Sequence, residues 1–121
     1  MARTSRAEAA AELRFVSADP EVLYLTTMGR QSGQPREIEI WFTARAGRYY
    51  VVSEHREEAA WVRNLLAEPR VQVRVGDLIF PARARVVHES TEPELAIAVQ
   101  ELSERKYGWG EGLVVELTPE P

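Results

Sequence analysis

The sequence predicts a small, mainly β domain with short helices, an α+β protein built on six mostly antiparallel strands. Apolar residues alternate with polar ones in several short runs, which is typical of strands that bury one face. The runs are joined by tight, glycine-containing turns rather than by regular helical crossovers, and only antiparallel strands can be joined by so few residues. This pattern favours a small barrel over a layered parallel sheet.

The elements can be placed in order along the chain. We expect an N-terminal helical segment within residues 1–19 and a barrel domain over residues 20–121. The first helix is predicted at 5–17, where Ser5 and Glu8 have the spacing of a capping box. Thr91 and Glu94 have the same spacing and are predicted to cap the last helix. Strands are predicted at 21–27, 36–44, 48–53, 71–75, 78–88 and 112–117, and the other helices at 57–67 and 91–106.

The composition restricts the classes of function. The chain has 121 residues and a net charge of −4, so it is large enough for one domain but lacks the basic face that nucleic-acid binding requires. It has no cysteine, which excludes disulfides and thiolate metal sites. No apolar run is long enough to span a membrane and no signal-like segment is seen. We therefore expect a cytoplasmic protein with no nucleic-acid partner and no transmembrane segment.

Residues 25–36, with the sequence LTTMGRQSGQPR, combine a strand-like run with a turn that is rich in hydrogen-bond donors. Two glycines allow backbone N–H groups to converge, two polar side chains add neutral donors, and two arginines add positive charge: Gly29, Gly33, Ser32, Gln34, Arg30 and Arg36. Such a turn can bind a phosphate. Its composition is also that of an ordinary hairpin connection, and the residues alone leave both interpretations open.

Further motifs follow this turn in a specific order. An aromatic pair, Trp41 and Phe42, precedes the run Y-V-V-S that ends at Ser53, and W-x-x-N-L begins at Trp61. Together with L-T-T-x-G-R-x-S-G-x-P-R, this order resembles the deazaflavin-dependent nitroreductase family, which belongs to the flavin-binding split barrels together with pyridoxamine phosphate oxidase-like proteins. The resemblance covers about residues 20–118. It implies a six-stranded antiparallel split β-barrel of the FMN-binding type, with the coenzyme in a groove on its outside.

The resemblance also implies a function. Proteins of this family use the deazaflavin coenzyme F420 to transfer a hydride to an electron-poor small-molecule acceptor such as a quinone, an enone or a nitroaromatic. FMN in the same groove is the alternative cofactor. A non-catalytic flavin- or ligand-binding protein on the same fold is the alternative function, because a fold does not establish an activity. Split barrels are usually homodimers, so the resemblance implies a homodimer here.

Site residues follow from the same resemblance. The phosphate side of the coenzyme is expected at Arg30, Gln31, Ser32, Gly33, Gln34 and Arg36, and the ring side at Trp41, Ser53, Trp61 and Asn64. Ser53 is the candidate catalytic residue, as a group that hydrogen-bonds the ring or the substrate rather than as a nucleophile. Tyr107 and Trp109 are assigned to the substrate. The residues alone also allow ordinary roles, such as core or interface aromatics and an amide that holds nearby backbone.

The chain departs from the family pattern next to the expected ring site. Family members commonly have proline where Glu39 lies, and lysine-glycine-glycine where the chain has glutamate, histidine and arginine at 54–56. Glu39 and Glu54 would bring negative charge close to an anionic coenzyme, and Arg56 or Arg63 could compensate for it. His55 lies among glutamates within a single loop, which is weak evidence for a metal site, so none is predicted.

Overall fold

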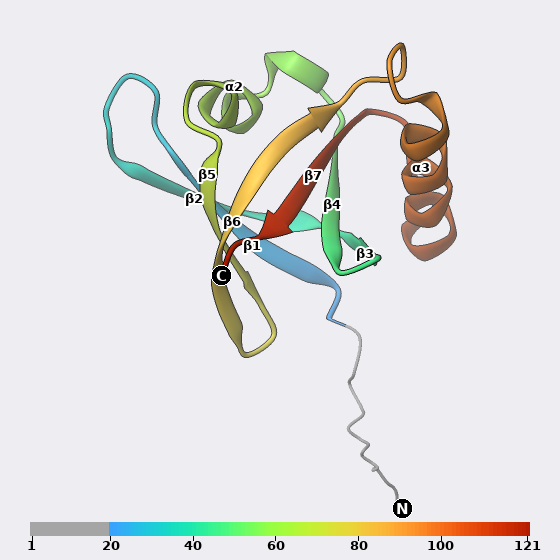
Figure 1. Cartoon of the computed structure of the whole chain (residues 1–121), viewed down its shortest axis with the longest axis horizontal. Helices are drawn as coiled ribbons and strands as arrows, with labels where there is room; N and C mark the ends of the chain where they lie inside the picture. The colour runs from blue at the N-terminus through green and yellow to red at the C-terminus, as the bar shows by residue number, and fades with distance from the viewer. Residues whose placement is uncertain (1–19) are drawn as a thin grey trace, which may run out of the picture.

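A computed structural model describes residues 20–121, and Figure 1 shows one curved sheet with helices packed on its outside. The predicted helix at 5–17 lies outside the described residues. The strands are β1 (Val22–Met28), β2 (Pro35–Trp41), β3 (Thr43–Arg45), β4 (Arg48–Ser53), β5 (Arg70–Val75), β6 (Leu78–Val87) and β7 (Leu113–Pro119). The helices are η1, a 3₁₀ turn (Arg56–Glu58), α2 (Ala60–Ala67) and α3 (Pro93–Tyr107). Within this part of the chain, no helix is long and apolar enough to cross a membrane.

The sheet closes on itself through a bent strand. Its seven strands run antiparallel to their neighbours in the order β2-β1-β5-β6-β7-β4-β3. β2 and β3 lie at opposite ends of this order, yet only Phe42 separates them in the chain. The two ends of the sheet must therefore meet at Phe42, which gives the predicted barrel. The single strand expected at 36–44 is divided there, and this accounts for seven strands where six were predicted.

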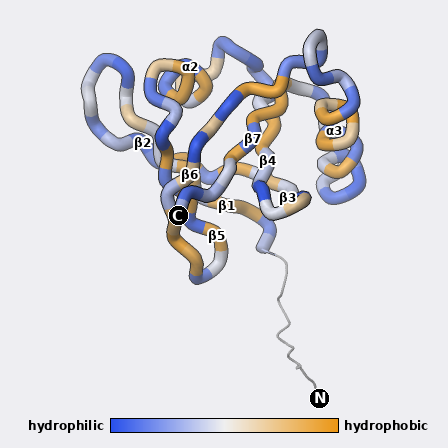
Figure 2. Tube along the Cα trace, in the orientation of Figure 1, coloured by the Kyte–Doolittle hydropathy of each residue, from blue (hydrophilic) through white to orange (hydrophobic). Residues whose placement is uncertain are grey.

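The barrel interior forms the main hydrophobic core. Leu23 and Leu25 from β1, Val73 from β5 and Val115 from β7 are fully buried in one cluster, to which α2 contributes Leu65. A second cluster lies on the outer face of the sheet beneath α3. Figure 2 shows hydrophobic residues on the strands and on one side of α3, and hydrophilic residues in the loop between β1 and β2. That loop is the donor-rich turn, which is thus free of the core and open to a ligand.

Side chains from the last turn of α3 form hydrogen bonds with the backbone of Phe42, where the strand bends. The Phe42 side chain is buried in the core, but its backbone N–H and C=O lie between two strands. The Tyr107 hydroxyl accepts a hydrogen bond from the Phe42 N–H at 3.0 Å and lies 2.8 Å from the Phe42 carbonyl oxygen and 2.7 Å from that of Glu21. Lys106 Nζ donates to the same Phe42 carbonyl at 3.0 Å. Buried backbone groups need partners, and here α3 provides them.

Two helix boundaries differ from the sequence prediction. The helix expected at 57–67 is divided, because Ala59 has extended backbone angles (φ −65°, ψ 137°) between η1 and α2. The last helix begins at Pro93 with Glu92 at its N-cap, and no side chain caps it, so the predicted cap by Thr91 is wrong. Proline is favoured in the first turn of a helix and disfavours helical angles in the residue before it. The start of α3 is therefore set by Pro93 rather than by the capping-box pattern.

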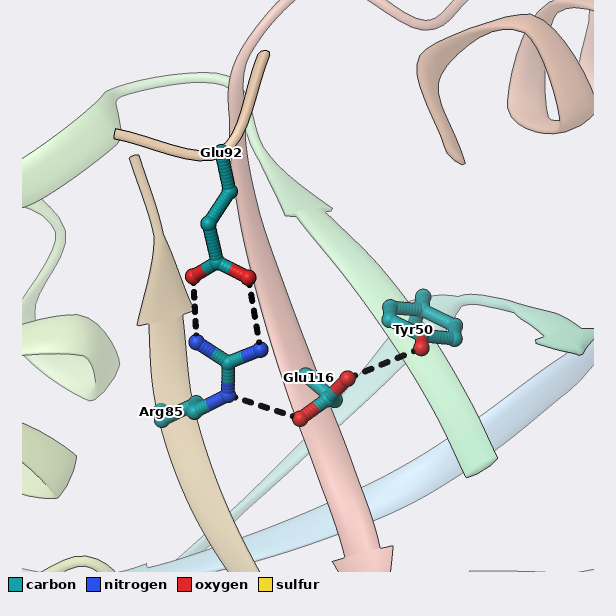
Figure 3. A network of polar contacts seen from close by, with 4 residues as sticks. All are labelled: Tyr50, Arg85, Glu92 and Glu116. Atoms are coloured by element: carbon teal, nitrogen blue, oxygen red, sulfur yellow. Dashed lines mark hydrogen bonds and ion pairs between the residues drawn. The ribbon is translucent and has the colours of Figure 1, made fainter. Parts of the chain in front are cut away.

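A polar network anchors the start of α3 to the sheet. Arg85 of β6 forms two hydrogen bonds with the Glu92 carboxylate and a third, of 2.8 Å, with Glu116 of β7. Glu116 is only 4% exposed, and its second oxygen accepts a hydrogen bond of 2.9 Å from Tyr50 of β4. Figure 3 shows the four side chains in a row across three strands and the loop before α3. Burial and the hydrogen bond to Glu116 raise the pKa of Tyr50 above its ordinary value.

Candidate active site

The described surface contains a cleft of about 490 Å³, which we call the main cleft. It lies on the outside of the barrel and is bordered by parts of β2, β3, β4 and α3. Its volume falls in the range of small-molecule sites. The residues that line it are Val22, Glu39, Ile40, Trp41, Phe42, Thr43, Tyr50, Val52, Ser53, Glu54, His55, Ala59, Trp61, Ser103 and Trp109.

A second hollow of about 410 Å³, which we call the basic recess, lies beside the donor-rich turn. Trp61 lines both hollows, so the main cleft and the basic recess adjoin at this residue, and we call the two together the groove. The arginines predicted to bind phosphate line the recess and are exposed. Its lining is Thr27, Gly29, Arg30, Gln31, Ser32, Arg36, Glu37, Ile38, Ala60, Trp61 and Asn64.

Backbone hydrogen bonds hold the turn in a compact shape. The Gly29 N–H donates to the Gln34 carbonyl at 2.8 Å, and the Gly33 N–H donates to the Gly29 carbonyl at 2.8 Å. Ser32 Oγ accepts a hydrogen bond from the Gln34 N–H at 3.1 Å. A Cβ at Gly29 would lie 2.5 Å from that Oγ, and Gly33 has a φ of +70°, so both positions favour glycine. Gly33 and Gln34 shape the turn, although neither lines the recess.

Asn64 ties this turn to helix α2. Its side-chain oxygen accepts hydrogen bonds from the Arg30 backbone N–H at 3.2 Å and from Arg30 Nη1 at 2.9 Å. Its amide nitrogen donates to Thr27 Oγ1 at 3.1 Å. Asn64 is 5% exposed and lines the basic recess rather than the main cleft. Its place is therefore beside the predicted phosphate site rather than at the ring side, and its amide orients Arg30.

Ser53 lies at the end of β4 and lines the main cleft. It is 2% exposed, and its hydroxyl donates to the Arg56 carbonyl at 3.0 Å. The proton of the hydroxyl is thus used within the protein, while the oxygen keeps lone pairs that can accept a hydrogen bond. Arg56 has a positive φ of 53°, and the bond from Ser53 holds this irregular backbone in place.

All three tryptophans of the chain line the main cleft, and they come from three separate segments. Trp41 is 43% exposed and stacks on Tyr107, with ring centroids 4.5 Å apart and an interplanar angle of 3°. Trp109 lines the cleft, as the substrate assignment requires, but Tyr107 does not. The Tyr107 hydroxyl forms hydrogen bonds with the backbone of Phe42 and Glu21. Tyr107 therefore stacks on Trp41 without lining the cleft itself.

The acidic departures from the family pattern do face the site. Glu39 and Glu54 line the main cleft, as does His55, whereas no arginine or lysine does so within residues 20–121. Arg56 points to Glu89 instead, at 2.6 Å, and Arg63 Nε donates to the Glu57 carbonyl at 3.4 Å. Neither arginine lines either part of the groove. The compensation that Arg56 or Arg63 could have given is therefore not seen in the described part of the chain.

Sequence reasoning missed Thr43, Tyr50 and Ser103, which are buried and line the main cleft. Thr43 is 6% exposed, and among the described residues its Oγ1 is the buried side-chain polar atom without a hydrogen-bond partner. Ser103 Oγ donates to the Trp109 carbonyl at 2.7 Å. Thr43 has the sequence phase of Glu37, Glu39 and Trp41 rather than that of the apolar Ile38, Ile40 and Phe42, so no local signal marked it as buried.

The residues of the groove fit a phosphate-bearing coenzyme with a planar ring. Arg30 and Arg36 line the basic recess, which suits a phosphate. The backbone N–H groups that the sequence suggested as further donors are used differently, because those of Gly29, Gly33 and Gln34 bond within the turn and that of Arg30 bonds to Asn64. Indole faces line the neighbouring cleft, which suits an aromatic ring system. A barrel of this topology with such a groove on its outside is a split barrel of the flavin-binding type.

A family comparison identifies the branch of this class. The family model described as F420H(2)-dependent quinone reductase matches residues 1–110. The chain therefore belongs to the F420H(2)-dependent quinone reductase family. It is an oxidoreductase, and its cofactor is the deazaflavin coenzyme F420. The family predicted from the sequence motifs and the main function predicted with it are confirmed.

Solved structures confirm the fold. An F420-H2 dependent reductase, FDR-A, has a TM-score of 0.67 at 22% identity over 80% of this chain and 93% of its own. The heme storage protein HutZ from Vibrio cholerae has a TM-score of 0.69 at 21% identity, over 85% of this chain and 84% of its own. A pyridoxamine 5′-phosphate oxidase-like protein from Listeria innocua has a TM-score of 0.66 at 19% identity, over 84% of this chain and 85% of its own. The split barrel is thus common to proteins with different ligands.

Proposed function

We propose that this protein reduces quinones, with the phosphate side of F420 in the basic recess and both the ring and the quinone in the main cleft. One observation carries the proposal: Trp61 joins a recess lined by two arginines to a cleft lined by three tryptophans. The recess offers charge and the cleft offers apolar faces, which are the two needs of a coenzyme with a phosphate and a ring. The quinone itself is named by the family description.

Reduced F420 supplies the hydride, and the cofactor carries the difficult chemistry. A quinone that takes up this hydride and one proton becomes a hydroquinone, and the coenzyme gives up both, so the reaction balances. Arg30 and Arg36 bind the phosphate, and Asn64 keeps Arg30 in place for it. Trp41 and Trp61 hold planar rings in the cleft. Ser53 accepts a hydrogen bond from the ring side of the bound ligands, because its proton already bonds to Arg56.

The test of this function is an anaerobic turnover assay. Reduced F420 is mixed with a neutral naphthoquinone, and the return of the oxidised coenzyme is followed by its absorbance. We expect oxidation well above the uncatalysed rate, and slower oxidation or none when reduced FMN or a nicotinamide cofactor replaces F420. Tight binding of F420 without oxidation by any quinone would contradict the reductase and favour the ligand-binding alternative.

We further propose that residues 20–121 form the split-barrel domain, that 1–19 are a separate N-terminal segment, and that the protein is a homodimer. Support for the dimer comes from a solved structure described as a domain-swapped dimer, which has a TM-score of 0.59 at 21% identity over 85% of this chain and 84% of its own. Sedimentation at micromolar concentration tests it, and a single species of 13.7 kDa would contradict it. The cytoplasmic location stays a prediction.

A further inference from the structure

We infer that the main cleft selects uncharged or cationic electron acceptors over anionic ones, and that Glu39 and Glu54 are the residues that determine this selection. The inference rests on the proposed function, since it concerns the acceptor that shares the cleft with the coenzyme ring. It goes further by assigning a charge to the acceptor class. Glu39 and Glu54 are two positions at which this chain departs from the family pattern, and the inference assigns the charge preference of the cleft to them.

The two carboxylates reach one cleft from different elements. Glu39 lies on β2 and Glu54 directly follows β4, and both line the main cleft. Both are exposed, and within residues 20–121 neither has an ion-pair partner. Glu37, which precedes Glu39 by two residues, differs in this respect because it lies 3.7 Å from Arg74. Within residues 20–121, no ion pair therefore neutralises Glu39 or Glu54 where they line the main cleft.

Among residues 20–121, the arginines that line the groove lie in its other part. Arg30 and Arg36 line the basic recess, and Arg56, which follows His55 in the loop after β4, is paired with Glu89. The groove is thus positive where the phosphate is proposed to bind and negative where the acceptor is proposed to bind. His55, which follows Glu54 in the chain, also lines the main cleft.

Coulomb's law gives the size of the effect. Two unit charges about 6 Å apart in a solvent-accessible cleft interact by roughly 1 kcal/mol, which is about a fivefold change in a rate or binding constant. Two carboxylates acting together disfavour an anion by about tenfold or more, and salt reduces the effect because both groups are exposed. A neutral quinone experiences none of this repulsion. The cleft therefore discriminates by charge while its tryptophans bind both kinds of ring.

The experiment compares two acceptors of nearly identical shape. One is a naphthoquinone with an acetate side chain, and the other carries the matching acetamide, in which an amide replaces the carboxylate. We measure kcat/KM for both with saturating reduced F420 at about pH 8, and take the amide-to-carboxylate ratio for each enzyme. Equilibrium binding of both compounds is measured in parallel by quenching of tryptophan fluorescence, since all three tryptophans line the main cleft.

The variants are Glu39→Gln, Glu54→Gln and the double variant. Glu58→Gln is the matched control, because it removes one exposed negative charge outside both parts of the groove. We expect wild type and the control to favour the amide by about tenfold or more, each single variant to reduce this ratio severalfold, and the double variant to bring it close to one.

Equal kcat/KM values for the two acceptors in wild type, or a ratio that the double variant leaves unchanged, would overturn the inference. In either case a normal rate with the amide would leave the proposed function intact. Failure of F420 to bind at all would instead contradict the proposed function, and the fluorescence titration of the two quinones would still report the charge preference of the cleft.

Discussion

The hydrogen bond that Ser53 makes within the protein limits the part that its hydroxyl can play in catalysis. The family resemblance places it beside the reactive part of the coenzyme, and the structure shows that its hydroxyl proton already bonds to the Arg56 carbonyl. A group that donates directly to developing charge contributes about 10²-fold or more to the rate, whereas an acceptor that also fixes a loop contributes less.

We therefore expect Ser53→Ala to lower kcat by about tenfold or less, because the hydroxyl already donates its proton to the Arg56 carbonyl and not to the ligand. Urea unfolding should show a loss of about 1 kcal/mol, the value of one hydrogen bond. Steady-state kinetics with F420 and a neutral quinone measure the first effect. A loss of kcat beyond 10²-fold in a stably folded variant would show that the hydroxyl acts as a direct donor.

Tyr107 allows a second prediction at the residue scale. Its hydroxyl serves the backbone of Phe42 and Glu21, and its ring stacks on Trp41. We expect Tyr107→Phe to lower the free energy of unfolding by about 1–3 kcal/mol, because buried backbone groups lose their partner. F420 affinity should change little, since the ring stack is kept. Tyr107→Ala, which also removes the stack, should weaken the binding of F420 further than Tyr107→Phe does.

At the scale of the elements, Gly112 packs closely against the end of β4 just before β7 begins. A Cβ on Gly112 would lie 2.5 Å from the Ser53 carbonyl oxygen and 2.8 Å from Val52 Cγ1. We expect Gly112→Ala to move the end of β4, to cost about 1–3 kcal/mol in stability and to lower activity through Ser53. Glu111→Ala, at the exposed neighbouring position, is the control for chemical denaturation and turnover. Wild-type stability in Gly112→Ala would contradict this account of the β4–β7 contact.

The hydrogen bonds between Arg85 and Glu92, which attach the start of α3 to the sheet, predict that the free energy of unfolding depends on pH. Hydrogen bonds from Arg85 lower the pKa of Glu92 below its ordinary value of 4.5. A carboxyl whose pKa is lowered by folding stabilises the protein above its unfolded pKa, and this contribution is lost as the pH falls through the folded value. We expect the free energy of unfolding to decrease below about pH 4.5, and Glu92→Gln to make this decrease shallower. Urea unfolding at a series of pH values measures both, and equal slopes would contradict the link.

The elements also show what the sequence could predict. Most strand positions follow from the alternation of apolar and polar residues, as in Val71, Val73 and Val75 of β5. The break at Phe42 could not be predicted, because Ile38, Ile40 and Phe42 keep the same alternation across it. The partners of Tyr107 and Asn64 lie far away in sequence, and such contacts leave no local pattern. The capping-box pattern predicts a helix start at Thr91, whereas Pro93 sets the observed start of α3.

At the scale of the whole molecule, the closed sheet explains why the functional groove is external. The barrel interior is filled by apolar side chains, so a ligand must bind where the donor-rich turn, the bent strand and the two helices meet on the outside. Nine of the twelve site residues predicted from the sequence line this groove, and the motifs also predict arginines at one end and acidic residues at the other. They do not predict that Arg56 and Arg63 stay outside the groove, because this depends on the partners that the fold gives to each arginine.

The central claim is that the basic recess binds the phosphate of F420 while its ring lies in the main cleft. An equilibrium titration tests it most directly, with F420 and FMN added separately to wild type, Arg36→Ala and the exposed control Arg83→Ala, and tryptophan fluorescence as the signal. We expect saturable quenching by F420, weaker binding of FMN, and a loss of about tenfold or more in F420 affinity in Arg36→Ala alone. Wild-type affinity in Arg36→Ala, or no binding of F420, would contradict the account.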